Sequence, residues 1–152
     1  MSANFRRYAV ADKPACLQLF DSNVPRFFDP TERAGFADFL DQPSGDYFVI
    51  ETAGTICGCG GYVTEDRGQA RFTWGMVDNV RHGSGLGRML TEYRLEAIVQ
   101  SGQFKEAELF TTYLVAPFFA KFGFATIAVE KDGFAPNMDR VQMIYTLPDK
   151  AE

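Results

Sequence analysis

The chain has 152 residues, of which 46% are hydrophobic and 23% are charged, and its formal net charge is −5. This length predicts one domain over residues 1–152, large enough to bury roughly two thirds of the surface of the unfolded chain. The acidic balance argues against nucleic-acid binding and against docking on an anionic membrane, since both rely on clustered Lys and Arg. Because no apolar run approaches a membrane span and no secretory signal pattern is present, we expect a cytoplasmic protein.

The cysteines and the single histidine argue against a metal site. Cys16, Cys57 and Cys59 make an odd number, and one His adds too few ligands for structural zinc. Cys57 and Cys59 are two residues apart in an expected strand, so we predict that they share one face as small buried hydrophobic residues.

The first third of the chain predicts a short strand and two helices. Phe5–Ala9 has an extended pattern, and Asp12 is a plausible N-cap for a helix with Pro14 in its first turn. A second helix is expected from about Thr31, and the turn-forming cluster Pro43–Asp46 ends this helical part.

The middle of the chain is rich in strands. Tyr47–Glu51 and Thr55–Thr64 predict a hairpin, and the glycines inside its second strand indicate a β-bulge or a close backbone approach. After a turn at Asp66–Gly68, the strand Ala70–Val77 follows. Simple alternation places three of its large side chains on one face: Phe72, Trp74 and Met76.

The last third alternates helices and strands. Apolar residues with helical spacing begin at Leu86 and stop before Ser101–Gly102. The later elements are expected at Ala107–Thr112 (strand), Ala116–Phe122 (helix), Phe124–Val129 and Val141–Leu147 (strands), with a loop at Lys131–Asn137 between the last two. This order predicts an α+β or mixed α/β fold with a twisted, largely antiparallel sheet flanked by helices.

The segment with the clearest chemistry joins the end of a strand at Val77 to the helix that begins at Leu86. It contains Gly83, Gly85 and Gly87, which allow a ligand to approach the backbone closely. The first N–H groups of a helix have no intrahelical partner, and the helix dipole adds partial positive charge there. Such an end can hold a phosphate or diphosphate without a lysine, even in an acidic protein.

Other phosphate loops fit less well. A P-loop needs Gly-Lys-Ser/Thr, and this chain has Arg88-Met89 at that point. A dinucleotide fingerprint needs a third glycine where Arg88 stands, and the repeated βαβ units of that fold are missing from the expected element order. The remaining alternative is that the glycines only shape a strand-to-helix turn.

Two motifs in order carry a resemblance to a known family. The run His82-Gly83-Ser84-Gly85-Leu86-Gly87 resembles the Arg/Gln-x-x-Gly-x-Gly/Ala loop of the GNAT superfamily of acetyl-CoA-dependent N-acetyltransferases. Thr112-x-x-Val115-x-x-x-Phe119-x-Lys121-x-Gly123-Phe124 resembles that family's second motif, Asn-x-x-Ala-x-x-x-Tyr-x-Lys-x-Gly-Phe. The resemblance implies a GNAT-like sheet in which two splayed strands form the cleft for coenzyme A (CoA).

The resemblance also implies which residues bind acetyl-CoA, the only cofactor expected, as a co-substrate and without a metal. The loop would hold the diphosphate, a backbone N–H near Met76–Val77 would stabilise the oxyanion, and the pantetheine arm would lie in the splay after Val77 and Thr112. The implied cofactor-binding residues are Met76, Val77, His82, Gly83, Ser84, Gly85, Leu86, Gly87, Arg88, Thr112 and Phe119.

Two departures from the family pattern concern chemistry. His82 replaces the usual Arg or Gln, so its imidazole either faces a phosphate or is simply an exposed loop side chain. Phe119 stands where many members carry a Tyr that protonates the CoA thiolate, and Phe has no proton to give. Tyr113 or an ordered water could take this role, or the thiolate leaves unassisted.

The general base and the acceptor site are left open, and no catalytic residue is assigned. Glu51, Asp78 and Asp139 are the acidic candidates, each also explicable as a solvated charge. The loop Lys131–Asn137 is either a lid over the acceptor or a wide turn. Six aromatic residues could line an acceptor pocket or belong to the core: Phe27, Phe28, Trp74, Tyr113, Phe134 and Tyr145.

The leading hypothesis is an N-acetyltransferase that moves an acetyl group from acetyl-CoA to a small-molecule or peptide amine by direct attack. The alternatives are a non-catalytic acyl-CoA-binding sensor and a structural domain. A homodimer through the C-terminal strands is common in the resembled family, but nothing in Val141–Leu147 requires one.

Overall fold

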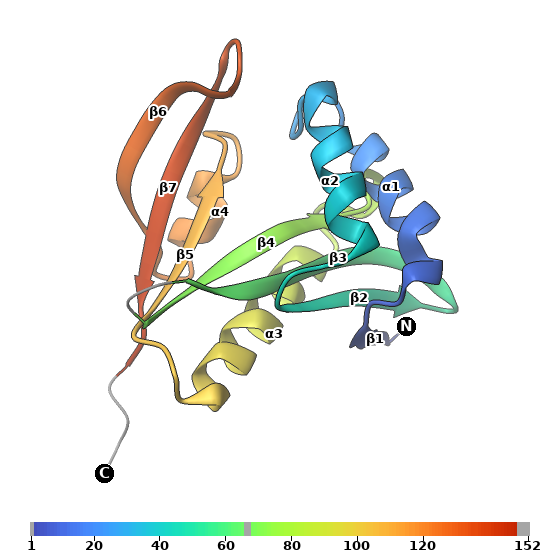
Figure 1. Ribbon diagram of the computed structural model, residues 1–152, viewed down its shortest axis with the longest axis horizontal. Coiled ribbons are helices and arrows are strands. Elements are labelled where there is room, and N and C mark those ends of the chain that lie inside the picture. The colour runs from blue at the N-terminus through green and yellow to red at the C-terminus, as the bar shows by residue number, and fades with distance from the viewer. Residues whose placement is uncertain (1, 66–67, 149–152) are drawn as a thin grey trace.

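A computed structural model describes residues 2–65 and 68–148 and shows one seven-stranded sheet with helices on both faces (Figure 1). The strand order is β1-β2-β3-β4-β5-β7-β6, so only the last two strands depart from the order of the chain. The strands are β1 (Ala3–Arg7), β2 (Asp46–Thr52), β3 (Thr55–Glu65), β4 (Gln69–Val77), β5 (Glu106–Thr111), β6 (Ala125–Ala135) and β7 (Met138–Thr146). Of the turn predicted at Asp66–Gly68, the first two residues lie outside the described ranges.

Every strand pair is antiparallel except β4 and β5, which run parallel. The predicted hairpin of β2 and β3 is confirmed; its register shifts beside Gly58, and the pairing of β3 with β4 shifts between Cys59 and Gly61. These irregularities match the bulge that the strand glycines indicate. The fold class predicted from the sequence, a mostly antiparallel mixed sheet, is therefore confirmed.

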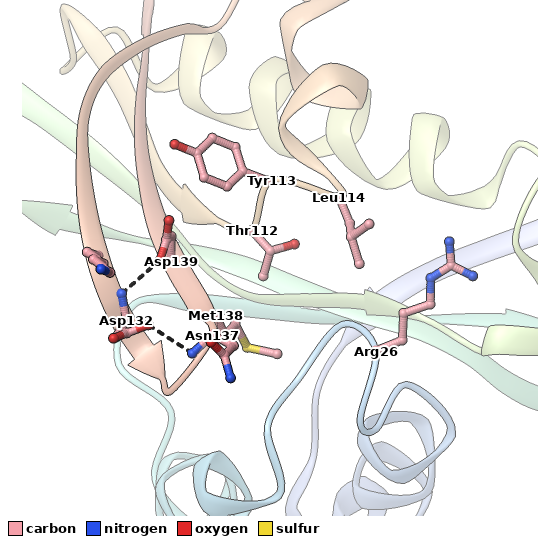
Figure 2. Close-up of a pocket in the computed structure, with 9 residues that line it drawn as sticks. Arg26, Thr112, Tyr113, Leu114, Asp132, Asn137, Met138 and Asp139 are labelled. Atoms are coloured by element: carbon pink, nitrogen blue, oxygen red, sulfur yellow. Dashed lines mark hydrogen bonds between the residues drawn. The ribbon is translucent and has the colours of Figure 1, made fainter.

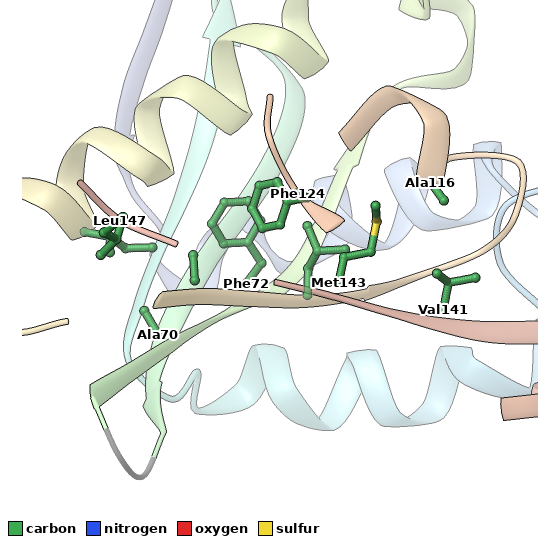
Figure 3. Packing of buried hydrophobic residues seen from close by; sticks show 10 residues of the cluster. Ala70, Phe72, Ala116, Phe124, Val141, Met143 and Leu147 are labelled. Atoms are coloured by element: carbon green, nitrogen blue, oxygen red, sulfur yellow. The ribbon is translucent and has the colours of Figure 1, made fainter. Parts of the chain in front are cut away.

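Two pairs of helices cover the two faces of this sheet (Figure 1). Helices α1 (Lys13–Ser22) and α2 (Arg33–Asp41) pack on one face around Phe20 and Phe36, both fully buried. On the other face, α3 (Leu86–Ser101) and α4 (Ala116–Ala120) share an apolar cluster with β4, β5 and β7 (Figure 3). The site described below lies where β4, β5 and the start of α3 meet.

Helix α1 begins where the sequence predicts, with Asp12 at the N-cap position and proline in the first turn, but the Asp12 side chain accepts no hydrogen bond from the helix. The Asp12 carboxylate accepts hydrogen bonds from the backbone N–H of Ala9 and from the guanidinium of Arg6, and these bonds hold its pKa below the usual value. Arg6 also contacts Glu51 at 3.0 Å, so this cluster ties β1 to β2 and to the start of α1.

The side-chain alternation predicted for β4 is wrong at one point. Phe72 packs with Ile98 on the α3 face, whereas Trp74 and Met76 pack with the α1–α2 cluster on the opposite face. The cause is a β-bulge: Gly61 pairs with Thr73 and Cys59 with Met76, so two steps along β3 span three along β4. Trp74 sits in this bulge with φ of +36°. The extra residue reverses the alternation between Phe72 and Trp74.

The same effect separates two cysteines that the sequence placed on one face. Cys57 belongs to the cluster with Leu86 and Leu90 on the α3 side, whereas Cys59 packs against α1 and α2. The register shift between Ile50 and Glu51 adds one residue to β3 near Cys57 and reverses the order of its faces. All three cysteines are free and buried, as expected of small hydrophobic residues.

The loop predicted at Lys131–Asn137 is largely strand. β6 continues to Ala135, and the hairpin turns at Pro136 and Asn137. Residues 131–134 form a wide irregularity, because Glu130 pairs with Arg140 and the next pair is Ala135 with Met138. Asp132 holds it in place, since its N–H donates to Asp139 Oδ1 and its own Oδ1 accepts from Asn137 N–H, both at 2.8 Å. These bonds describe an ordered hairpin and not an open lid.

β3 packs closely against β2 at Gly61, and a substitution there tests this packing. A methyl group at this position would overlap the carbonyl oxygen of Asp46 and lie 2.8 Å from Tyr47 Cα, both of which are backbone atoms. We therefore expect Gly61→Ala to lower the free energy of unfolding by about 1–3 kcal/mol in chemical denaturation.

The matched control for this substitution is Gly35→Ala in α2, where the nearest atom to the added methyl is Trp74 Cζ2 at an ordinary 3.9 Å. Alanine favours the helix by up to about 1 kcal/mol over glycine, so this variant should be as stable as the wild type or more so. Equal effects of the two substitutions would contradict the described packing.

Candidate functional site

The N-terminal end of α3 presents backbone N–H groups to open space. Gly83 and Gly85 adopt left-handed conformations, with φ of +83° and +93°. The first bond of the helix runs from Met89 N–H to the Gly85 carbonyl at 3.0 Å. The N–H groups of Leu86, Gly87 and Arg88 therefore have no intrahelical acceptor, and they converge where the helix dipole is positive.

The space in front of these N–H groups is free of described side chains. A Cβ atom added to Gly83 or Gly85 would meet nothing within 4 Å, whereas one at Gly87 would lie 3.5 Å from the Phe118 ring of α4. The concave side of the loop is thus open, and its helix side packs against α4. This shape and charge fit a phosphate or diphosphate group.

The imidazole of His82 is turned toward the end of β4. Its Nε2 lies 3.1 Å from the carbonyl oxygen of Val77, and its ring packs edge-on against Phe27 at 5.1 Å between centroids. Because a carbonyl can only accept, Nε2 carries the hydrogen in this contact. Asn23 Nδ2 donates to the same carbonyl at 3.0 Å. We therefore assign the His82 side chain to the end of β4 and not to the phosphate loop.

These two contacts also orient the Val77 N–H. In a strand, the N–H and C=O of one residue point to the same side, and the Val77 carbonyl bonds to side chains instead of β3. The next residue alternates, since Asp78 N–H donates to the Cys57 carbonyl of β3 at 2.9 Å. The Val77 N–H is therefore directed away from β3, toward the side where β5 lies.

On that side, β4 and β5 separate. Their parallel pairing covers only three positions, from Gln69 with Glu106 to Arg71 with Glu108. Beyond this point β5 keeps only β7, which pairs along its other edge, and β4 has no described partner on this side up to Val77. Two hydroxyl groups next to the separation, Thr73 Oγ1 and Thr112 Oγ1, are buried without a hydrogen-bond partner. The splayed strand pair expected from the sequence is thus present.

The bulge in β4 is held by a buried tyrosine. Tyr47 Oη donates to the Trp74 carbonyl at 2.6 Å and contacts Cys59 Sγ at 3.2 Å. Burial raises the pKa of Tyr47 well above its ordinary value, so the hydroxyl keeps its hydrogen. The carbonyl that the bulge removes from the β3 ladder therefore keeps an internal partner.

A buried arginine next to this bulge was not predicted from the sequence. Arg94 of α3 is 3% exposed, and its guanidinium lies 3.8 Å from the centre of the Phe72 ring. It lies on the buried face of α3 together with Leu90 and Ile98. The sequence signal that could have indicated this arginine is Gly75 in β4, because a side chain at that position would collide with the guanidinium.

Phe119 lies in the apolar cluster beside the splay. Its ring packs edge-on against Phe72 and Phe124, with centroids 6.4 and 5.7 Å apart. It extends from α4 toward β4 and contributes no polar atom. Tyr113, one of the alternatives considered as a proton donor, is 59% exposed on the segment after β5.

A cavity of about 390 Å³ opens between the β6–β7 hairpin, the segment after β5 and the α1–α2 connection (Figure 2). Thr112 and Leu114 line it from the segment after β5, Asp132 and Asp139 from the hairpin, and Arg26 from the opposite side. Of the six aromatic residues considered for an acceptor pocket, Tyr113 lines this cavity. Phe28 and Trp74 pack on the α1–α2 cluster, and Tyr145 packs against the cluster on the other face.

The three acidic candidates for a general base lie in different places. Glu51 pairs with Arg6 at the β1–β2 edge, and Asp78 accepts from Val80 N–H in a short 3₁₀ turn. Asp139 lines the cavity, where one of its oxygens accepts from Asp132 N–H.

Among residues 2–65 and 68–148, no group of three or more His, Cys, Asp or Glu side chains is arranged to hold a metal ion. None of the helices in the described part of the chain is long and apolar enough to cross a membrane.

Tyr47→Phe tests how the bulge is held. Removing the hydroxyl leaves the buried Trp74 carbonyl without a partner, so we expect a loss of about 1–3 kcal/mol in the free energy of unfolding, measured by urea denaturation. Tyr8→Phe is the matched control, because that hydroxyl donates to the Leu40 carbonyl at 2.8 Å in a half-buried position away from β4. A Tyr47→Phe loss no larger than the Tyr8→Phe loss would count against this role.

Comparisons with known proteins agree with this geometry. The family model described as an acetyltransferase (GNAT) domain matches residues 43–126, which is more than half of the chain. A comparison with the sequences of curated proteins found no match.

Solved structures with the same fold cover nearly the whole chain. The ribosomal-protein-S18-alanine N-acetyltransferase from Escherichia coli is 16% identical with a TM-score of 0.82, covering 99% of this chain and 97% of its own. Ard1 from Thermoplasma volcanium is 16% identical with a TM-score of 0.81, covering 98% of this chain and 100% of its own. An aminoglycoside 6′-N-acetyltransferase complexed with coenzyme A is 12% identical with a TM-score of 0.77, covering 98% and 99%. The chain belongs to the GNAT acetyltransferase family.

Proposed function

We propose that this protein transfers an acetyl group from acetyl-CoA to the amine of a small molecule or peptide. The observation that carries the proposal is the combination of an open, amide-lined helix N-terminus with a strand pair that separates directly beside it. The first feature suits the diphosphate of CoA, and the second suits an extended, amide-containing arm such as pantetheine. Structural neighbours include an N-acetyltransferase complexed with coenzyme A.

In this proposal the diphosphate lies against the loop and first turn of α3, from His82 to Arg88. The pantetheine arm runs between β4 and β5, where Thr112 offers a hydroxyl without an internal partner. The Val77 N–H, directed to the same side, is the candidate donor to the thioester oxygen, with Met76 fixing the strand beside it. Phe119 forms the apolar wall near the sulfur.

The chemistry is direct attack of the neutral amine on the thioester carbon. The loop and first turn of α3, which together form a cradle for the diphosphate, position the acyl group. The Val77 N–H stabilises the negative charge that forms on the acyl oxygen. Because the loop binds through backbone groups, its function depends on the shape of the glycine turn more than on the identity of its side chains. This dependence gives the sharpest test of the binding site.

Gly85→Glu is expected to abolish the thermal stabilisation by CoA and the release of thiol from acetyl-CoA with an amine panel. The new carboxylate would project into the open space in front of the N–H groups and compete with the diphosphate. The measurement is the Tm of wild type and variant with and without excess CoA, followed by a thiol-release assay.

Gly54→Glu is the matched control for this variant. Gly54 also has a left-handed φ, of +79°, with nothing within 4 Å of an added Cβ, but it lies in the β2–β3 turn. This variant should have a similar backbone strain, and the rise in Tm on adding CoA should be the same as in the wild type. Loss of the shift in both variants, or in neither, would contradict the proposed cradle. Binding without turnover on any amine would favour the acyl-CoA sensor over the enzyme.

We further propose that the acceptor amine enters through the cavity of about 390 Å³ lined by Thr112 and Asp139. This cavity opens at the end of β5, next to the proposed pantetheine path, and is on the α1–α2 side of the sheet (Figure 2). Its charged wall, Asp132 and Asp139 opposite Arg26, suits a polar acceptor. Of the three acidic candidates, Asp139 is the one that lines this cavity, and it is available to receive the proton of the attacking amine.

Leu114→Trp tests the entry route, because Leu114 lines the cavity and is 55% exposed. Filling the cavity should raise the KM for the amine by about tenfold and leave the KM for acetyl-CoA unchanged. Val99→Trp, at an exposed position near the end of α3, is the matched control and should change neither value. A rise in the KM for acetyl-CoA alone would place the acceptor elsewhere.

A further inference from the structure

Arg94 is a buried cation without an acidic partner in the described residues. One guanidinium nitrogen lies 3.4 Å from the Gly61 carbonyl, a weak contact, and Nε has no hydrogen-bond partner. The face of the guanidinium rests on the Phe72 ring. Burying a charge is costly unless it is paired, so a purely structural element would be expected to use an apolar residue here.

The groups that face Arg94 come from three strands. Tyr47 of β2 and Cys59 of β3 are the titratable groups close enough to influence it, and β4 contributes Phe72 and Gly75. Burial lowers the pKa of Arg94 to about 9, which still leaves the side chain protonated at neutral pH. Tyr47 keeps its hydrogen because its own pKa is raised. The site therefore holds one positive charge with no described carboxylate against it.

The position of this charge is defined by Gly75. Both terminal nitrogens of Arg94 lie 2.8 Å from the point where a Cβ of Gly75 would be. Gly75 itself is exposed, and it lies in the part of β4 that has separated from β5, two residues before Val77. Because Gly75 has no side chain, the guanidinium approaches the backbone of an exposed residue beside the splay. An arginine on the opposite face of the helix would have no such access.

Resting on the proposed function, we propose that Arg94 is a positioning and electrostatic residue that stabilises the negative charge formed on the thioester during acetyl transfer. The amine nitrogen attacks the thioester carbon, and the C=O electron pair moves to the oxygen. When the C–O double bond re-forms, the C–S bond breaks and its electron pair leaves with the sulfur as thiolate. The nitrogen releases its proton to a base or water, and the thiolate is free to take one from solvent. Arg94 transfers no proton.

This role accounts for a chain that carries Phe119 in place of a proton donor. A thiolate that is stabilised by a nearby buried charge is a better leaving group and needs less protonation as it departs. The low-dielectric surroundings of Arg94 strengthen its effect on the neighbouring splay. Arg94 stacks on Phe72, and the Phe72 ring packs edge-on against Phe119, so the charge adjoins the apolar wall proposed for the sulfur.

The direct test is to measure the pKa of the thiol of bound CoA. The ultraviolet absorbance of the thiolate is recorded as the pH is raised. Complexes with desulfo-CoA supply the background from the protein's own Cys and Tyr residues. In the wild-type complex the thiol pKa should lie below that of free CoA. Arg94→Met should raise it by about one unit or more, a tenfold change in thiolate formation, whereas Arg94→Lys should keep most of the wild-type shift. An equal thiol pKa in all three complexes would overturn the inference.

Activity and stability separate an electrostatic role from a structural one. Arg94→Met should lower kcat by about tenfold or more with the KM for acetyl-CoA nearly unchanged, and its Tm should be equal to or above that of the wild type because an unpaired buried charge is removed. A lower Tm with an unchanged thiol pKa would identify a structural residue and overturn the proposal.

The two proposals fail in different ways. If the wild type binds CoA and shows no shift of the thiol pKa, the role of Arg94 is wrong and the acetyltransferase proposal stands. If the wild type binds no CoA, the proposed function itself is wrong and the role of Arg94 fails with it. Binding with a thiol pKa shift but no turnover would contradict the enzyme proposal and keep the charge effect of Arg94.

Discussion

The short parallel pairing of β4 with β5 is the constraint on which the rest of this structure depends. Two strands in the middle of a sheet share only three pairing positions, so the remainder of β4 lacks a backbone partner on that side. Unpaired backbone groups in a protein interior are costly, and the fold supplies partners for the carbonyls. Asn23 and His82 donate to the Val77 carbonyl, and Tyr47 donates to the Trp74 carbonyl, which the bulge removes from the β3 ladder. The Val77 N–H is left to face the separation, where a ligand can bind.

Backbone chemistry also resolves the apparent conflict between an acidic chain and a polyphosphate ligand. The net charge of −5 argues against ligands that are held by clustered basic side chains. The start of α3 offers N–H groups and a helix dipole instead, shaped by two left-handed glycines. The one basic side chain buried in this region, Arg94, lies under the strand and not in the loop. The positions of the positively charged groups in this protein are thus set by the fold and cannot be inferred from its net charge.

The parts of the fold that follow from local sequence were predictable. The helix of α3 and its glycine loop follow from periodicity and from residues that tolerate left-handed φ, and the β2–β3 hairpin follows from alternation around a turn. Side-chain direction beyond a bulge was not predictable, because one extra residue reverses the faces of a strand. Trp74 and Cys57 are the two positions where this happened. Residue propensities also predicted too short a strand for β6. Pairing with β7 resumes at Ala135, beyond residues whose composition is typical of a loop.

The candidate site divides in the same way. The glycine loop was found from sequence, because its backbone requirement fixes the residue type. Arg94 was not predicted, because the surroundings of its side chain depend on Gly75 and Phe72. These residues are distant in sequence and contact Arg94 only through the packing of α3 on the sheet. The acceptor cavity combines segments around Arg26, Thr112 and Asp139, and no local pattern connects them.

The most direct test of this account is a crystal structure of the protein with CoA. We predict that the diphosphate oxygens accept hydrogen bonds from the N–H groups at the start of α3, and that the pantetheine arm lies between β4 and β5 with its sulfur near Val77 and Phe119. CoA bound at any other surface, or a structure in which β4 and β5 close together and the loop stays free of the diphosphate, would contradict the account.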